Sequence, residues 1–339
     1  MSTASGRNRE LALLARIRKR AAMQPAPNLR LGIGDDCALL RLGSNQELAV
    51  TTDLNIAGRH FQLDLHPPES IGHRTLARGL SDLAAMGARP VAAFLSLGLP
   101  RQLAGKWLDR FFDGFFALAN EHKVPLAGGD LAESPVAVAD IVLTGAVPHS
   151  KALLRSGARP GHLLYVTGNL GGAAAGLAQL KKLAAVQTAR GRRAAQPKPG
   201  KIPSALRGKL APHLFPQPRL AQGLWLMRRG LASAAIDISD GLSTDLAHLC
   251  DESGVGVKLL AASLPIHSGA TLEQALHGGE DYELLFTAPP SACIPRRIAG
   301  VPINRIGRIT RAYAGVHQVL LLTRKGYEQV APRGWQHFS

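Results

Sequence analysis

Residues 234 to 250 read Ala-Ala-Ile-Asp-Ile-Ser-Asp-Gly-Leu-Ser-Thr-Asp-Leu-Ala-His-Leu-Cys, and this short stretch carries the clearest structural pattern of the chain. Its apolar beginning predicts a buried strand from Ala234 to Ile238, and the periodic apolar residues after the glycine predict a helix from Ser243 to Cys250. Asp237 lies in the predicted strand and Asp240 follows it, beside the glycine. The pattern is therefore a strand and a helix with two carboxylates at their junction.

The same alternation of strands and helices continues along the rest of the chain. We expect strands at residues 47–52, 91–97, 141–147, 163–167 and 282–287, and helices at residues 68–86, 107–120 and 219–229, besides an opening helix closed by Pro25-Ala26-Pro27. Such alternation is typical of an α/β or α+β layer architecture. Turn residues accumulate from Pro148 to Gly161, so we place a boundary between an N-terminal domain, residues 1–150, and a C-terminal domain, residues 151–339.

Carboxylates next to glycine at the ends of apolar segments are the recurrent motif. Four further places share the pattern of residues 237–241, namely Gly32-Ile-Gly-Asp-Asp36, Thr51-Thr-Asp53, Gly128-Gly-Asp130 and Gly278-Gly-Glu-Asp281. Asp82 adds a carboxylate near the C-terminal end of a predicted helix, where it opposes the helix dipole. A single Asp-Gly is usually structural, because both are preferred turn residues. Five such places in a chain with only 24 acidic residues favour a site for metal ions and phosphate.

Magnesium is the metal that this pattern favours. Neighbouring aspartates repel each other unless a cation occupies the space between them. Mg²⁺ prefers oxygen ligands and keeps several waters, so single carboxylates from different loops can link it to substrate phosphates. The phosphate-binding loop with Gly-Lys-Ser/Thr and the protein-kinase motifs are both missing, and residues 237–241 lack the spacing of a calcium loop.

Composition limits the remaining possibilities. With 339 residues, 46% of them hydrophobic, the chain is long enough for two ordinary domains. It contains no run of roughly 20 apolar residues that could span a bilayer, and its first residues are polar and basic, so we expect a soluble cytoplasmic protein. Three widely spaced cysteines provide neither a disulfide framework nor a Cys-x-x-Cys metal site.

Positive charge is concentrated in one segment. The formal net charge is +16, and residues 181–209 contain nine Lys and Arg residues and no acidic residue. Because this segment is also rich in Ala, Gly, Pro and Gln, we interpret it as a basic flexible insertion. The alternative is a non-catalytic protein that binds nucleic acid through this segment. Charge alone supplies only salt-sensitive, unspecific binding, however, and no aromatic residues for base stacking are interleaved.

Taken in order, the motifs resemble those of the thiamine-monophosphate kinase family. The resemblance covers nearly the whole chain and comprises residues 32–40, Thr51-Thr-Asp53 with His60-Phe61, residues 80–88, Gly128-Gly-Asp130, residues 155–158, 236–242 and 278–286, and Gly334-Trp-Gln-His-Phe338. It implies the two-domain fold of aminoimidazole ribonucleotide synthetase, with an N-terminal mixed sheet that pairs in a homodimer and an α/β C-terminal domain. The implied activity is ATP-dependent phosphorylation of thiamine monophosphate to thiamine diphosphate with release of ADP, the last step of thiamine diphosphate biosynthesis.

The resemblance also implies roles for individual residues. The Mg²⁺ ligands would be Asp36, Thr51, Thr52, Asp53, Asp82, Asp130, Asp237 and Asp240; ATP would contact Gly129, Asp130, Arg155 and Ser239; the substrate would contact His60, Glu280 and Trp335, whose ring would stack on the heterocycle. The N-terminal domain would bind ATP and magnesium and form the dimer, and the C-terminal domain would supply substrate-contacting loops. Because the acceptor phosphate is already ionised near neutral pH, we expect direct in-line transfer without a general base.

Three residues depart from the family pattern: Leu131 replaces a hydroxyl residue, Phe215 a basic residue and Trp335 a frequent Tyr. These departures bear on phosphate and substrate affinity, whereas every metal-type carboxylate is retained. Two relatives in the same superfamily are disfavoured. A selenophosphate synthetase requires a reactive Cys or selenocysteine with a Lys near the N-terminus, and the hydrogenase-maturation relative requires a C-terminal Cys. This chain ends in Gln336-His-Phe-Ser339, and Cys37 is an apolar spacer.

Overall fold

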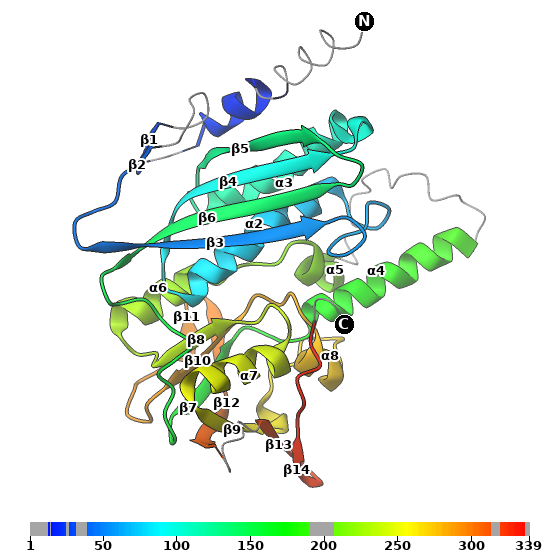
Figure 1. Cartoon of the computed structure of the whole chain (residues 1–339). Coiled ribbons are helices and arrows are strands. Elements are labelled where there is room, and N and C mark those ends of the chain that lie inside the picture. The colour runs from blue at the N-terminus through cyan, green and yellow to red at the C-terminus, as the bar shows by residue number, and fades with distance from the viewer. Residues whose placement is uncertain are drawn as a thin grey trace, which may run out of the picture. The chain divides into compact units, whose positions relative to one another are not determined.

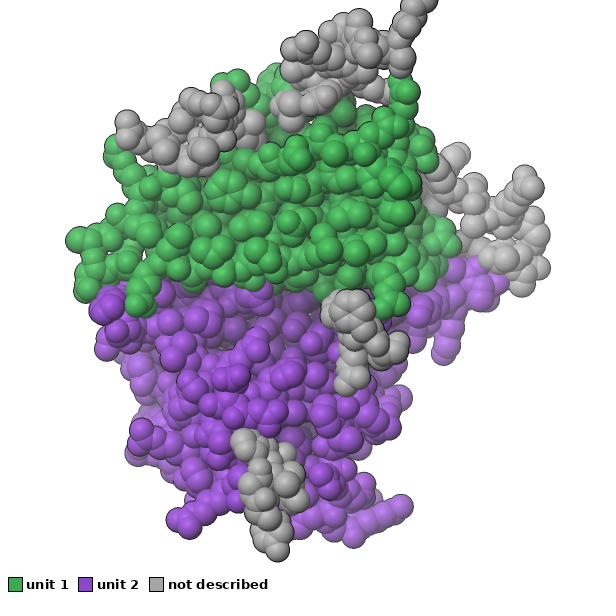
Figure 2. All heavy atoms as spheres, in the orientation of Figure 1, with its two compact units in different colours: residues 1–79, 90–146, 195–199 green, residues 80–89, 147–194, 200–339 purple. Residues whose placement is uncertain are grey.

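The computed structural model describes residues 13, 15–24, 27–31, 39–189, 207–312 and 319–335. The chain forms two compact units, which Figure 2 shows in different colours. Unit 1 comprises residues 1–79, 90–146 and 195–199, and unit 2 comprises residues 80–89, 147–194 and 200–339. Within the part of the chain that is described, no helix is long and apolar enough to cross a membrane.

Unit 1 is built around a four-stranded sheet with the strand order β3-β6-β4-β5 (Figure 1). Its strands are β3 (Gln46–Ile56), β4 (Arg89–Leu99), β5 (Leu126–Glu133) and β6 (Val138–Pro148). The helices are α2 (Pro68–Ala85), whose residues from position 80 onward belong to unit 2, and α3 (Lys106–Glu121), with the short 3-10 helix η1 (Arg101–Leu103) before it. A small antiparallel pair, β1 (Leu29–Leu31) and β2 (Leu39–Leu40), precedes the sheet in the chain.

The core of unit 1 contains a cluster of aromatic side chains on α3. Phe111, Phe112, Phe115 and Phe116 of α3 are all buried, and successive pairs among them stack or meet edge to face. Their spacing of one and four residues gives the helix one wide apolar face. This face explains why the helix could be predicted from apolar periodicity alone.

Unit 2 contains a larger sheet with the strand order β14-β13-β9-β12-β7-β10-β8, and β11 pairs with β12. The strands are β7 (Leu163–Thr167), β8 (Ala234–Asp237), β9 (Val255–Leu260), β10 (Leu284–Ala288), β11 (Arg297–Ile298), β12 (Val301–Arg311), β13 (Val319–Thr323) and β14 (Gly326–Gln329). The helices are α4 (Gly172–Ala189), α5 (Arg207–Leu214), α6 (Leu220–Arg229), α7 (Leu242–Ser253) and α8 (Leu272–His277), with the 3-10 helix η3 (Ala261–Ser263).

One apolar cluster holds these elements together. Leu164 of β7, Ile236 of β8, Leu285 of β10 and Leu246 of α7 are at most 2% exposed and belong to the same core. Burying them fixes the end of β8 beside the start of α7. The short loop of residues 238–241 is therefore held at both of its ends.

The mixed α and β architecture is confirmed, and some elements differ in detail from the predictions. The strand β3 continues to Ile56, so Asp53 lies within a strand and not at its end, and Asp130 likewise lies inside β5. The basic segment begins and ends in helices, because its residues 181–189 belong to α4 and its residues 207–209 to α5. Ala, Leu and Lys favour helix at these positions. Residues 190–206 of the segment lie outside the described residues.

Candidate active site

In unit 2, the predicted site residues converge on the loop between β8 and α7. Asp237 is the last residue of β8 and is only 3% exposed, and Asp240 follows in the loop. The Ser81 hydroxyl donates a hydrogen bond to Oδ2 of Asp237 at 2.7 Å. Ser81 precedes Asp82 in the last turn of α2, so Asp82 belongs to the same neighbourhood as Asp237.

Asp245, in the first turn of α7, shapes this loop. Its Oδ2 atom accepts hydrogen bonds from the backbone N–H groups of Ser239 at 3.1 Å, Asp240 at 3.0 Å and Gly241 at 3.0 Å. The N–H groups at a helix start lack intrahelical partners, so a carboxylate there is stabilised. Asp245 was not predicted as a site residue; its place in the first turn of a predicted helix was the available signal.

A second loop, residues 278–283, is hydrogen-bonded to the first. The Glu280 N–H donates to the Ser239 carbonyl at 2.8 Å, and the Tyr282 N–H donates to the Ile238 carbonyl at 2.8 Å. Glu280 and Tyr282 have φ values of 67° and 49°, which residues with side chains adopt rarely. Backbone strain of this kind persists where the surrounding structure enforces it, and it is frequent at active sites. The pairing puts Glu280, a predicted substrate contact, beside Ser239, a predicted ATP contact.

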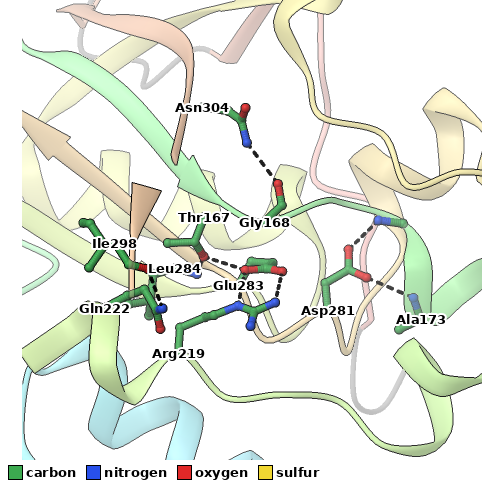
Figure 3. A network of polar contacts seen from close by, with 11 residues as sticks. Thr167, Gly168, Ala173, Arg219, Gln222, Asp281, Glu283, Leu284, Ile298 and Asn304 are labelled. Atoms are coloured by element: carbon green, nitrogen blue, oxygen red, sulfur yellow. Dashed lines mark hydrogen bonds and ion pairs between the residues drawn. The ribbon is translucent and has the colours of Figure 1, made fainter. Parts of the chain in front are cut away.

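Two further acids of this loop, Asp281 and Glu283, bind other parts of the chain through hydrogen bonds and an ion pair (Figure 3). Asp281 accepts hydrogen bonds from the N–H groups of Gly171 at 2.5 Å and Ala173 at 3.0 Å, at the start of α4. Glu283 meets Arg219 through two contacts of 2.6 Å. Asp281 and Glu283 therefore anchor the loop that carries Glu280.

The C-terminal segment places Trp335 beside the loop of residues 238–241. The backbone N–H of Trp335 donates to the Asp240 carbonyl at 3.0 Å, and the Trp335 residue is 42% exposed. The backbone carbonyl of Arg155 accepts a hydrogen bond from the Ser253 hydroxyl at 2.8 Å. The structure thus brings Asp237, Asp240 and Trp335 together in one unit, and the charge of Arg155 reaches Asp237 electrostatically.

Asp237 and Asp245 are buried, and the carboxylates of Asp237, Asp240 and Asp245 repel one another. Burial raises the pKa of Asp237, the Ser81 hydrogen bond and the charge of Arg155 counteract this increase, and Asp240 adds to it. Burial, followed by the charges of Asp237 and Asp240, raises the pKa of Asp245 to about 8. A cation beside these groups would relieve the repulsion.

The chemistry of the donors fits Mg²⁺, because all of them are oxygens. Among the described residues, no three or more His, Cys, Asp and Glu side chains are arranged to hold a metal ion by themselves. An ion that keeps several waters and also binds phosphate does not require such an arrangement. The metal assignment therefore rests on donor type and charge, and it stays a prediction.

In unit 1, the predicted residues occupy the two edge strands of the sheet. Thr51, Thr52 and Asp53 lie on β3, whereas Gly129 and Asp130 lie on β5, with β6 and β4 between them. Unit 1 therefore does not bring its two groups of predicted residues together. Asp36 lies outside the described residues.

Contacts within unit 1 fix several of these residues. Oδ2 of Asp53 lies 3.1 Å from Nε of Arg78 on α2, so the structure pairs this predicted metal ligand with a guanidinium. Nδ1 of His60 accepts a hydrogen bond from the Ile56 N–H at 3.1 Å. Asp130 is exposed. Before it, Gly129 has a φ of 147°, and a Cβ atom there would collide with the Leu95 carbonyl of β4.

The fold and this loop arrangement place the chain in the AIR synthase-related class. Residues 34–148 match the family "AIR synthase related protein, N-terminal domain", and residues 159–318 match "AIR synthase related protein, C-terminal domain". The two-domain fold predicted from the sequence is thereby confirmed. A thiamine-monophosphate kinase from Salmonella typhimurium is 38% identical over 95% of this chain and 98% of its own length. This chain belongs to the thiamine-monophosphate kinase family.

Solved structures agree with this assignment. The thiamine-monophosphate kinase from Stenotrophomonas maltophilia K279a is 38% identical and superimposes with a TM-score of 0.73, covering 91% of this chain and 95% of that chain. The structure of AaThiL complexed with AMPPCP and TMP is 30% identical, with a TM-score of 0.73 and coverage of 97% of both chains.

Proposed function

We propose that this chain transfers the terminal phosphate of ATP to thiamine monophosphate, which yields thiamine diphosphate and ADP. Membership of the kinase family over nearly the full length supports this activity. The observation that carries it is the hydrogen bond of 2.8 Å between the Glu280 N–H and the Ser239 carbonyl. It joins the backbone of a predicted ATP contact to that of a predicted substrate contact.

The residues of the chain bind and orient the two phosphates. Gly129, Asp130, Arg155 and Ser239 would hold ATP, and His60, Glu280 and Trp335 would hold thiamine monophosphate. The acceptor oxygen is already ionised near neutral pH, so no side chain has to remove a proton. The remaining barrier is the repulsion between two anions, which alignment and positive charge reduce.

We also propose that Mg²⁺ assists the transfer. Asp36, Thr51, Thr52, Asp53 and Asp130 in the N-terminal part, together with Asp82, Asp237 and Asp240, would hold the ions. When bound, Mg²⁺ neutralises phosphate charge and draws the reacting groups into line. Asp245 fixes the backbone on which Asp240 is carried, whatever ion is present.

A homodimer through the N-terminal domain is part of the proposal. Leu48, Val50 and Leu54 lie at alternate positions of the edge strand β3, so they share one face, and they are 46%, 57% and 47% exposed. An exposed apolar row on an edge strand is typical of a surface that another chain covers. Residues 1–150 would then bind ATP and magnesium and form the dimer, and residues 151–339 would supply the substrate-contacting loops.

A coupled assay of ADP release tests the activity. Purified chain with ATP and Mg²⁺ is measured with and without thiamine monophosphate, and the product is identified by chromatography. We expect ADP and thiamine diphosphate to appear together, and only when the acceptor is present. Folded, magnesium-loaded protein that makes no thiamine diphosphate would contradict the proposal.

A further inference from the structure

The last described residues of the chain, 333–335, are bound to the loop that carries Asp240. The Trp335 N–H donates to the Asp240 carbonyl at 3.0 Å, and the Gly334 N–H donates to the Thr244 hydroxyl at 3.0 Å. Thr244 lies in the first turn of α7, directly after the loop. Two successive backbone N–H groups therefore fasten the segment to the junction of the loop and the helix.

The Arg333 side chain makes a second attachment, to α8. Its Nη2 atom lies 2.9 Å from Nε2 of His277 and 3.3 Å from Oε1 of Glu273. Nδ1 of His277 lies 2.8 Å from the Ser243 hydroxyl of α7, so His277 links Arg333 to that helix. The exposed Arg333–Glu273 pair contributes little by itself.

The protonation state of His277 suits this contact. A guanidinium can only donate, so Nε2 of His277 must accept, which requires a neutral ring. Burial lowers the pKa of His277, the neighbouring Glu273 opposes this change, and Arg333 adds to it. The remaining hydrogen-bonding neighbour of the ring is the uncharged Ser243 hydroxyl.

Gly334 lies directly on the backbone of the Asp240 loop. A Cβ atom at this position would collide with the Asp240 carbonyl and would come within 2.6 Å of the Thr244 hydroxyl oxygen. Any residue with a side chain would therefore lift the segment away from the loop. This close approach is an observation independent of the hydrogen bonds, and it points to the same attachment.

We infer that residues 333–335 form a latch that holds the Trp335 ring in place beside the Asp240 loop, with Arg333, Gly334 and Thr244 as positioning residues for the heterocyclic part of the substrate. This inference rests on the proposed function. An aromatic side chain whose backbone is not held has many orientations, and ordering it on binding would cost affinity. The latch fixes the backbone that carries the ring in advance, so fewer orientations of Trp335 remain to be ordered when a heterocycle stacks on it.

The test uses the full chain and matched substitutions. Gly334→Ala removes the close approach, and Gly208→Ala, where nothing lies within 4 Å of an added Cβ, is its control. Arg333→Ala removes the second attachment, Arg333→Lys is the conservative variant, and Arg324→Ala is an exposed control on the turn after β13.

Steady-state kinetics distinguish a loss of substrate positioning from a loss of folding stability in these variants. We expect Gly334→Ala to raise the KM for thiamine monophosphate at least about tenfold, since misplaced binding groups cost rate and affinity steeply. Its KM for ATP and its unfolding midpoint should remain near those of the parent chain. Arg333→Ala should raise the same KM, and Arg333→Lys should restore part of the loss because it keeps a donor near His277.

Hydrogen exchange measures the latch without turnover. The peptide that contains Trp335 should exchange faster in Gly334→Ala than in Gly208→Ala. If the parent chain does not phosphorylate thiamine monophosphate, the proposed function fails, and the exchange result still tests the attachment. Unchanged exchange in Gly334→Ala would overturn the latch. An unchanged KM for thiamine monophosphate, or a fall in kcat that only parallels a lower unfolding midpoint, would overturn its role in positioning.

Discussion

Replacing Arg219 with alanine leaves a buried carboxylate without its cation. The Glu283 side chain is 4% exposed, meets Arg219 through two contacts of 2.6 Å, and accepts a third hydrogen bond of 2.6 Å from the Thr167 hydroxyl (Figure 3). Removing one partner of such a pair costs about 3–5 kcal/mol. For a unit of roughly 150–250 residues each kcal/mol lowers the unfolding midpoint by about 2–4 °C, so we expect a decrease of roughly 6–20 °C.

Differential scanning calorimetry measures this decrease. Arg228→Ala on α6, the helix that begins directly after Arg219, is the control, because Arg228 is exposed. Adding Glu283→Gln to Arg219→Ala should recover part of the loss, since no uncompensated charge then remains buried. A midpoint for Arg219→Ala within about 2 °C of the Arg228→Ala control, well below the change expected for such a pair, would refute the reasoning that this pair anchors the loop of residues 278–283.

Four further predictions concern the site and the dimer. Asp245→Ala leaves three loop N–H groups without their acceptor, so turnover should fall at least about tenfold in steady-state assays, whereas the exposed Glu252→Ala on the same helix should retain it. Burial raises the pKa of Asp281 from 3.8 to about 7, so the folded state favours the protonated acid and its stability falls as pH rises from about 4 to 7. Asp281→Asn should flatten this part of the pH dependence of urea unfolding, and equal slopes for both proteins would contradict the assignment. Asp53→Ala should lower turnover by orders of magnitude at saturating magnesium with little change in circular dichroism, and normal turnover would exclude the metal role. Val50→Lys should convert a dimer into monomers by light scattering during gel filtration, because a charge in the apolar row of β3 opposes its burial.

Elements with a strong local pattern could be predicted from the sequence. The strand β7 has the predicted bounds, Leu163–Thr167, because a short apolar run there is enclosed by turn residues. The long strand β12, Val301–Arg311, was not predicted. Proline and three arginines interrupt its apolar residues, and its extended form depends on pairing with β7 and β9 on either side.

The types of residue in the site could be predicted from the sequence, but the role of each residue could not. Carboxylates beside glycine singled out Asp237, Asp240 and Glu280, and the structure joins their two loops. The role of Asp281 could not be foreseen, because its N–H partners lie more than a hundred residues away along the chain. Contacts between residues far apart in the sequence decide whether an acid binds a ligand or accepts hydrogen bonds from the backbone.

The position of Asp245 has a consequence for how a nucleotide approaches. The start of a helix is ordinarily an attractive place for a phosphate, because free N–H groups point outward there. In α7, a carboxylate of the protein already occupies the N–H groups of the preceding loop. An incoming polyphosphate would therefore find these three N–H groups already hydrogen-bonded, and its charge would have to be met by side chains and cations. The backbone N–H groups of residues 239–241 thus serve the protein's own Asp245, and recognition of a nucleotide at this loop would fall to other groups.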